Sequence, residues 1–313
     1  LNGHENVAES VRQQVLATAD RLRYQPHAAA RSLSSRRTQT IGVVLPDLYG
    51  EFFSELMRGI DQVARTRGQH LLVSSYHGHP EEQGEALRAM RGRVDGLLVL
   101  SPYTDRPGFL VDNLPSSLPV VLINTDVQDS PYPALTIDNY SAAVAMVEHL
   151  VQAGHRRIAF YGGHADSSSC HQRRLGYAQA LAEAGRELHP DWLIESAPSR
   201  LEAAARSEEL FARVPTPTAA VCYNDSVALG LMLGLASRGV RPGVDFAVTG
   251  FDDISEAAVA LPPLTTLTVN PRERGRQAAE LLLQRLDHPD AAPQRTVAPV
   301  QLRIRASSGP VAA

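Results

Sequence analysis

Lysine is absent from this chain of 313 residues, so its 30 basic side chains of fixed charge are all arginine. Cysteine is almost absent, because Cys170 and Cys222 are the two that occur. They lie far apart and form no metal-binding or redox spacing, which excludes a disulfide framework and indicates a reduced, cytoplasmic protein. Apolar runs of membrane-spanning length and a signal-peptide hydrophobic region are also missing, which excludes a membrane partner.

The motifs of common enzyme classes are absent as well. The sequence contains no Gly-x-Ser-x-Gly elbow, no phosphate-binding loop, and no Gly-x-Gly-x-x-Gly after a strand pattern. Adjacent acids such as Asp252 and Asp253 rarely face one ligand together, which argues against glycoside hydrolysis. His77 and His79 have no third ligand at a fixed spacing, so a surface turn is preferred to a metal site. We therefore predict neither an enzyme, nor a metal site, nor a cofactor.

The charge is unevenly distributed along the chain. Its net value is −4, but residues 1–40 hold six arginines against three acids, Glu5, Glu9 and Asp20. That segment is therefore net positive by +3, and the remaining residues carry −7. A basic N-terminal segment on an acidic body is typical of a nucleic-acid-binding module attached to another domain.

The basic N-terminal segment contains two helix patterns. Residues 6–22 have an apolar stripe at helical spacing, which one helix cannot bury without partner helices. Residues 24–37 form a short pattern of small residues that begins at Pro26 and carries Arg31 and a single projecting leucine, Leu33. Such a helix has little to bury within its own domain. It is either a helix that folds against nucleic acid or an ordinary linker helix.

From Thr40 onward, strand and helix patterns alternate, which predicts α/β structure with parallel sheets covered by helices on both faces. The expected strands are Ile41–Leu45, His70–Ser75, Gly96–Leu100, Val120–Asn124, Ala134–Ile137, Arg157–Tyr161, Ala219–Tyr223, Phe246–Gly250 and Thr265–Val269. The expected helices are Glu51–Arg67, Glu81–Arg91, Ser141–Ala153, His171–Ala184, Leu201–Arg213, Ser226–Arg238 and Arg272–Leu286. These strands are too many for one sheet. We therefore expect two sheets divided near Gly162, with later segments crossing between them.

Ligands of open parallel sheets bind beyond the carboxyl ends of the strands. The positions that follow the expected strands hold acids, amides, arginine and aromatic residues: Asp47, Tyr49, Phe52, Phe53, Asn124, Asp126, Asp138, Asn139, Arg173, Arg174, Asn224, Asp225, Asp252 and Asp253. Aromatic faces together with such polar groups suit a sugar or a similar polyhydroxylated molecule. Each Asp or Asn could instead cap the next helix. For Arg173, Asn224 and Asp252 together we favour a ligand.

Several short motifs, in this order and spacing, resemble the lactose-repressor (LacI/GalR) family of bacterial transcription regulators along almost the whole chain. They are Val7–Tyr24, Ala30-Arg31-Ser32-Leu33, Ile41–Asp47, Val94-Asp95-Gly96-Leu97, Ile137-Asp138-Asn139, Gly154–Ala159, Asn224-Asp225, Gly250–Asp253 and Pro263–Thr266. The resemblance implies a homodimer that binds operator DNA, and a periplasmic-binding-protein-like core that binds an effector between two subdomains.

The resemblance also implies a division of the chain and roles for single residues. It makes 1–25 the end of a helix-turn-helix headpiece, 26–39 a hinge helix, 40–161 with 270–298 the first subdomain, and 162–269 with 299–308 the second. In the hinge, Ala30, Arg31 and Leu33 are expected to contact DNA, with Leu33 as a minor-groove wedge. The implied effector-binding residues are Phe52, Phe53, Asp138, Arg173, Asn224 and Asp252.

Three features depart from the family pattern. The helix-turn-helix itself would precede Leu1, so residues 1–313 alone are expected not to read an operator in the major groove. His27 stands where members commonly have asparagine. The stretch Ser196–Pro198, where members often place a ligand-stacking aromatic residue, has none, and the nearest is Trp192. After Arg305 the leucine-heptad tail of tetrameric members is missing, which favours a dimer.

A repressor of carbohydrate-metabolism genes that responds to a sugar is therefore the expected function. The rival class is a periplasmic-type sugar-binding protein of a transport system, whose core is built in the same way. That class needs an export signal and gives no role to residues 1–37, so the regulator is preferred. An enzyme that uses the same cleft has no catalytic constellation behind it.

Overall fold

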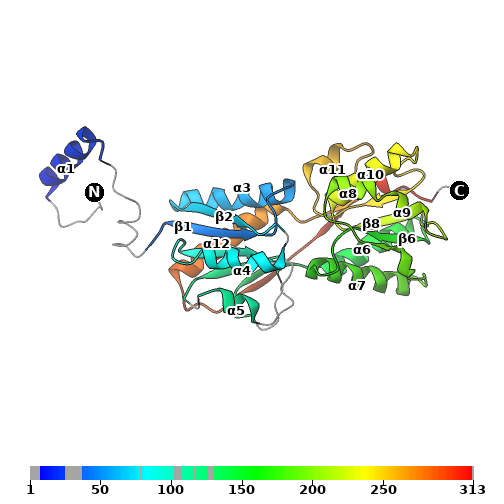
Figure 1. Ribbon diagram of the computed structural model, residues 1–313, viewed down its shortest axis with the longest axis horizontal. Helices are drawn as coiled ribbons and strands as arrows, with labels where there is room; N and C mark the ends of the chain where they lie inside the picture. The colour runs from blue at the N-terminus through cyan, green and yellow to red at the C-terminus, as the bar shows by residue number, and fades with distance from the viewer. Residues whose placement is uncertain are drawn as a thin grey trace.

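The computed structural model describes residues 8–24, 37–77, 79–101, 108–115, 117–125 and 130–311. Helix α1 (Glu9–Arg21) lies apart from two α/β subdomains that are arranged end to end (Figure 1). It buries none of its residues, and Val11, Val15 and Leu16 of its apolar stripe are exposed. The expected hinge residues Ala30, Arg31 and Leu33 lie outside the described residues.

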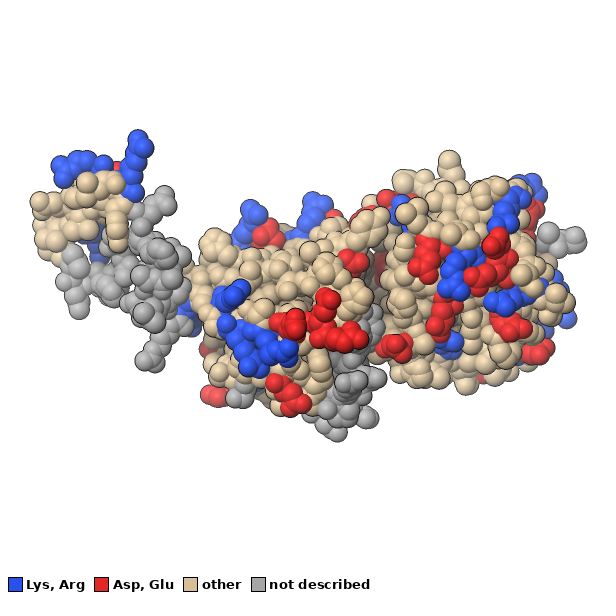
Figure 2. Space-filling model, viewed as in Figure 1, with Lys and Arg blue, Asp and Glu red and all other residues tan. Residues whose placement is uncertain are grey.

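Charge is distributed differently over α1 and the two subdomains. Basic side chains are prominent at α1 (Figure 2), and the arginines of this segment are Arg12 and Arg21 in the helix and Arg23 after it. On the subdomains, arginines and acids are interspersed (Figure 2). None of the helices in the described part of the chain is long and apolar enough to cross a membrane.

The first subdomain is built on a six-stranded parallel sheet of order β11-β5-β4-β3-β1-β2. Its strands are β1 (Thr40–Leu45), β2 (His70–Ser75), β3 (Gly96–Leu100), β4 (Val120–Ile123), β5 (Ala134–Ile137) and β11 (Arg295–Ala298). One face packs against α3 (Glu51–Thr66) and α12 (Pro271–Asp287), and the other against α4 (Pro80–Ala89) and α5 (Phe109–Asn113). Because both faces are covered, the central strands are continuous apolar runs.

The second subdomain has a four-stranded parallel sheet of order β7-β6-β8-β9. Its strands are β6 (Ile158–Tyr161), β7 (Leu193–Ile194), β8 (Ala219–Cys222) and β9 (Ala247–Thr249). Helices α6 (Asn139–Gln152) and α7 (Ser168–Glu183) cover one face. The other face is covered by α8 (Arg200–Ala205), α9 (Glu208–Phe211), α10 (Asp225–Ser237) and α11 (Ser255–Val259). Beside this sheet lie the antiparallel strands β10 (Thr266–Thr268) and β12 (Gln301–Arg303), and two 3-10 turns, η1 (Pro190–Trp192) and η2 (Ala306–Ser308), complete the elements.

The boundary expected near Gly162 is wrong, and so is the assignment of residues 139–161 to the first subdomain. Strand β6 pairs with β7 and β8, and α6 packs with α7 on the same sheet. The chain therefore enters the second subdomain directly after β5. The expected single helix over Leu201–Arg213 is two short helices, α8 and α9. The sequence pattern could not place β6, because a buried parallel strand looks the same in either sheet.

The chain crosses between the subdomains three times, after β5, after β10 and after β11. The side chain of Arg274 in α12 lies at these crossings and is buried. Its Nε donates to the carbonyl oxygen of Val269 at 3.0 Å, and its Nη2 donates to that of Thr136 at 3.2 Å. Burial lowers the pKa of Arg274 to about 10. The arginine thus ties the start of α12 to two of the crossing segments.

Candidate functional site

A cavity of about 530 Å³ lies between the two subdomains. Its walls follow the carboxyl ends of parallel strands on both sides, as expected for ligand sites of open α/β sheets. On the first subdomain, Asp47 follows β1 and Asn124 follows β4. On the second, Tyr223 and Asn224 follow β8 and Asp252 lies beyond β9. Both sheets therefore contribute polar side chains to a single space.

Arg173, from the first half of α7, is the buried cation of this cavity. Its Nε donates to Oδ1 of Asn139 at 2.9 Å, and its Nη1 donates to the carbonyl oxygen of Tyr223. The guanidinium carbon lies 3.4 Å from the ring centre of Phe251, a cation–π contact. These contacts hold the arginine in one orientation, with three of its five N–H groups left over.

Asp252 lies beside Arg173 and is the buried acid that lines the cavity; 8% of its surface is exposed. Burial raises the pKa of Asp252 well above its ordinary value, although the positive charge of Arg173 opposes this effect. Its backbone has a φ of 119°, in the region that favours glycine. Such strain in a buried polar residue is a feature of ligand sites, where it aims a side chain.

Asn224 and Asp138 both cap helices. Asn224 is the N-cap of α10, and its Oδ1 accepts from the backbone N–H of Val227 at 3.0 Å. It also lines the cavity, so its amide nitrogen is left for a ligand. Asp138 is the N-cap of α6, accepts from the N–H of Ser141 at 2.9 Å, and is exposed. Asp138 is not among the cavity-lining residues, whereas its neighbour Asn139 is.

Phe52 and Phe53 form the aromatic part of the wall on the first subdomain. They belong to the first turn of α3, and their rings meet edge to face with centroids 5.3 Å apart. Both are half-buried. The six expected effector residues therefore divide into five that line one cavity and Asp138, which does not.

Several lining residues were not among the six expected effector-binding residues, and they include Asn124, Asn139, Ser169 and Tyr223. Ser169 and the hydroxyl of Tyr223 are hydrogen-bonded at 3.1 Å. The Oδ1 atom of Asn124 is buried without a hydrogen-bond partner in the described structure. An unpartnered buried acceptor is costly, so it is a candidate to receive a ligand hydrogen bond. The strand-end rule had selected Asn124 and Asn139, but nothing in the sequence ranked them above their neighbours.

Other residues that the sequence pointed to have structural roles. Trp192 is buried, stacks on His189, and donates its indole N–H to the carbonyl oxygen of Pro215 at 3.1 Å. It is therefore not a ligand-stacking residue of this cavity. Asp253 pairs with Arg305 at 2.6 Å, away from the cavity lining. The part of the chain that the structure describes holds no group of three or more residues that could bind a metal.

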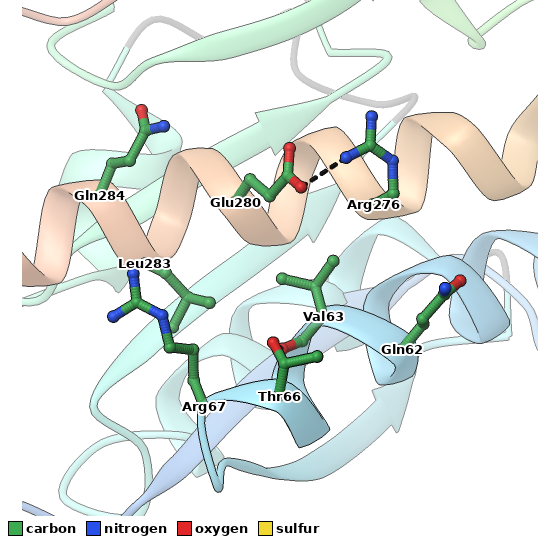
Figure 3. A pocket seen from close by; sticks show the side chains of 8 residues that line it. All are labelled: Gln62, Val63, Thr66, Arg67, Arg276, Glu280, Leu283 and Gln284. Atoms are coloured by element: carbon green, nitrogen blue, oxygen red, sulfur yellow. Dashed lines mark hydrogen bonds and ion pairs between the residues drawn. The ribbon is translucent and has the colours of Figure 1, made fainter.

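A second hollow of about 350 Å³ lies between α3 and α12 (Figure 3). Its floor is Val63 and Leu283, and its charged side chains are already paired within the protein. Arg276 pairs with Glu280, as drawn in Figure 3, and Arg67 pairs with Asp287 at 3.2 Å. This hollow offers few unsatisfied groups, so the cavity between the subdomains is the better candidate site.

Comparison with known proteins shows to which family this architecture belongs. The family model described as periplasmic binding proteins and sugar binding domain of LacI family matches residues 38–306. Among individual proteins, the HTH-type transcriptional repressor PurR of Vibrio campbellii is 32% identical over 288 residues, covering 91% of this chain and 86% of that protein. The repressor PurR of Photobacterium profundum is 33% identical over 290 residues, with the same coverage. The chain belongs to the LacI family of transcriptional regulators.

Solved structures agree with this LacI-family assignment. The lac repressor dimer bound to operator and the anti-inducer ONPF superimposes with a TM-score of 0.86 at 25% identity, covering 98% of this chain and 93% of that one. The regulator CelR in complex with cellobiose gives 0.77 at 28% identity, with the same coverage. A LacI-family regulator of Enterococcus faecium with bound ribose gives 0.77 at 26% identity, covering 87% of this chain and all of that one.

These matches confirm the two-subdomain α/β fold and the regulator class. Because the relatives along 91% of the chain are repressors, this LacI-family protein is a transcriptional repressor and not a transport-associated binding protein. They also confirm that it is not an enzyme, since the matched relatives are regulators.

Proposed function

We propose that this LacI-family repressor binds a sugar or glycoside in the cavity between its subdomains, and that the bound sugar changes its affinity for operator DNA at carbohydrate-metabolism genes. The observation that carries this proposal is the presence of buried Arg173 and Asp252 in one cavity with the rings of Phe52 and Phe53. A polyol offers both donors and acceptors, and a guanidinium with a carboxylate matches both kinds at once. Aromatic rings suit the apolar face of a sugar ring.

Two of the similar solved structures support the same ligand class, whereas the PurR relatives do not. The similar structures include one titled as a complex with cellobiose and one titled with bound ribose. The positions of Arg173 and Asp252 in the present cavity are suited to neutral hydroxyl groups, which both of those molecules carry. Asn224 adds an amide donor beside them.

The proposal assigns the DNA-binding role to the N-terminal region and to a homodimer. The lac repressor relative is a dimer bound to operator in its structure. Ala30, Arg31 and Leu33 of the hinge would contact the minor groove, with Leu33 inserted between base pairs. A ligand that favours one relative orientation of the subdomains would then shift the DNA-binding equilibrium of the hinge.

Loss of one polar partner should weaken sugar binding by about 1–3 kcal/mol, which is roughly ten- to a hundredfold in affinity. The test begins with a thermal-shift screen of sugars, because a ligand that binds the folded state raises the melting temperature. Calorimetry on Asp252→Asn and Arg173→Ala then measures the loss. Affinity of the natural protein should also fall as the pH is lowered, because protonation removes the carboxylate that accepts from ligand hydroxyls.

Asp253→Asn is the matched control, since Asp253 is the next residue, pairs with Arg305 and does not line the cavity. Its sugar affinity should stay within about twofold of the natural protein, a difference of roughly 0.4 kcal/mol. If Asp252→Asn and Arg173→Ala both bind the sugar as tightly as the natural protein does, the proposed site is wrong.

A further inference from the structure

Carboxylic acids predominate among the charged groups of the cavity between the subdomains. Among the described residues that line it, the acids are Asp47, Glu51, Asp166 and Asp252, the arginine is Arg173, and the histidines are His77, His79 and His164. Even where Asp252 is protonated, the three acids Asp47, Glu51 and Asp166 face the single arginine, an excess of two negative charges. An anionic ligand would therefore approach a wall of its own sign, which lowers both its encounter rate and its affinity.

Arg173 is poorly placed to offset this repulsion. Its Nε–H is bonded to Asn139, so the side-on edge by which an arginine grips a carboxylate or phosphate with two bonds is already occupied. One Nη1–H is bonded to the carbonyl oxygen of Tyr223. The positive charge of Arg173 also acts on Asp252, where it opposes the rise in pKa that burial causes. What remains is a small number of N–H groups, which suits single hydrogen bonds to hydroxyl oxygens.

Helix N-termini are the other common anion-binding elements, and several of those that begin at the cavity are already capped by a side chain. Helices α6, α7 and α10 each begin with a side chain that accepts from their own first turn. The bonds are Ser141 N–H to Asp138 at 2.9 Å, Cys170 N–H to Ser167 at 3.4 Å and Val227 N–H to Asn224 at 3.0 Å. These N–H groups are therefore not free to hold a phosphate.

Helices α4 and α11 begin at cavity-lining residues without a side-chain cap, and so does α3. Its N-cap is Gly50, but Glu51 follows in the first turn. The carboxylate of Glu51 accepts from the backbone N–H of Ser255, at the start of α11 on the opposite subdomain, at 2.8 Å. This carboxylate places a negative charge where an anion at α3 would otherwise sit.

Beside the N–H donors of Arg173 and Asn224, the cavity offers acceptors to a ligand. Oδ1 of Asn124 is buried without a partner, and Asp252 presents a buried carboxyl. Both groups can accept hydrogen bonds from a ligand. We propose that the effector is an uncharged, hydroxyl-rich molecule, and that its phosphorylated or carboxylated counterparts are rejected. This inference rests on the proposed function, since it names the ligand class of the same cavity.

Matched ligand pairs test this charge selection. Calorimetry would compare glucose with glucose 6-phosphate and glucuronate, ribose with ribose 5-phosphate, and adenosine with its 5′-monophosphate, after a thermal-shift survey of neutral hexoses, pentoses and disaccharides. We expect a neutral molecule to bind and its anionic counterpart to bind at least tenfold more weakly. Raising the salt concentration should narrow this difference, because salt screens repulsion between exposed charges.

A charge-reversal variant makes the test specific to the cavity. Asp166 is exposed and lines the cavity, so Asp166→Arg should raise the affinity for the phosphorylated ligand, relative to that for the neutral ligand, at least threefold. Glu148→Arg is the control, with the same change in net charge. Glu148 is exposed on α6, roughly 13 Å along the helix from the cavity-lining Asn139 at 1.5 Å per residue. It should change neither affinity.

The outcomes separate the two proposals. An anionic ligand that binds as tightly as its neutral counterpart overturns the charge inference but leaves a sugar-effector site in place. Binding of adenosine alone supports the charge inference and overturns the sugar. If Asp166→Arg does not improve the affinity for the phosphorylated ligand relative to that for the neutral ligand, the inference is overturned, because local charge then does not decide between neutral and anionic ligands. If no neutral or anionic probe binds, both proposals fall.

Discussion

Asp225 and Asp252 are buried carboxyls near the same strand ends, and their surroundings give them different roles. Asp252 faces the cavity beside Arg173. Asp225 is fully buried beneath it and does not line the cavity. It accepts from the hydroxyl of Thr266 at 2.5 Å and from the backbone N–H of Ile254 at 2.9 Å. Asp225 therefore joins the start of α10 to the segment that follows β9 and to strand β10.

The pKa of Asp225 predicts a pH-dependent stability. Burial raises this pKa to about 6 from an ordinary 3.8, so the folded state binds a proton at this site more tightly than the unfolded state does. The contribution of Asp225 to the free energy of unfolding should therefore fall as the pH rises from about 4 to about 6, by up to about 3 kcal/mol. Asp225→Asn should remove this decline. Urea unfolding at pH 4.5, 5.5 and 7 measures it.

Asp290→Asn serves as the control for that series, because Asp290 is exposed. It should leave the pH profile of the natural protein unchanged. Equal pH slopes for the natural protein and Asp225→Asn would contradict the prediction and would mean that Asp225 stays charged in the folded protein throughout this range.

At the scale of elements, two glycines bring α3 and α12 into close contact. A Cβ atom at Gly59 would lie 1.9 Å from the carbonyl oxygen of Arg272, and one at Gly275 would lie 2.0 Å from that of Leu56. Both neighbours are backbone atoms, which cannot rotate away. The same pair of helices is joined at the surface by an ion pair between Arg272 and Glu55 at 2.5 Å. The helices therefore touch backbone to backbone on one face of the first sheet.

Gly275→Ala should destabilise the protein by roughly 1–3 kcal/mol, the usual cost of overpacking a close contact. This loss should appear despite the better helix propensity of alanine, which by itself would favour the variant by about 1 kcal/mol. Gly84→Ala in α4 is the matched control. A Cβ there would meet only the flexible ends of Arg88 and Asn113, so its free energy of unfolding should change little. Similar values for the two variants would show that the helices can separate without cost.

At the scale of the whole molecule, three chain crossings connect two subdomains that enclose the candidate site. The bond between Glu51 and Ser255 joins the subdomains at the cavity itself. A ligand held by both walls must favour the orientation in which the walls face each other. In a LacI-family repressor this orientation is the physical quantity that can be transmitted toward the N-terminal region, to which we assign DNA binding.

The hinge gives a prediction at this scale. If Leu33 is a minor-groove wedge, Leu33→Ala in the full-length protein should weaken operator binding at least tenfold, because the inserted side chain stabilises the bent DNA. Effector affinity and melting temperature should stay nearly unchanged. Fluorescence anisotropy with a selected operator measures operator binding. Titration calorimetry measures effector affinity, and differential scanning calorimetry measures the melting temperature. A large fall in melting temperature would mean that Leu33 is packed inside the protein.

The local order of helices and strands could be read from the sequence, because it depends on neighbouring residues. The alternation from Thr40 onward, and the glycines after Arg67, Ala153 and Arg238, indicate strand and helix positions close to those observed. The strand-end rule also selected several of the residues that line the cavity, including Arg173 and Asp252. That much follows from periodicity and capping alone.

Tertiary structure decided what depends on contacts between distant segments. The sheet that β6 joins, and with it the boundary between the subdomains, is set by pairing with β8, some sixty residues later in the chain. Asp138 and Asn139 are adjacent and chemically similar, yet the first α6 turn directs only Asn139 to Arg173 and the cavity. The burial that raises the pKa of Asp252 likewise comes from segments brought together by folding. Sequence determined which residues were available, and packing determined which of them meet.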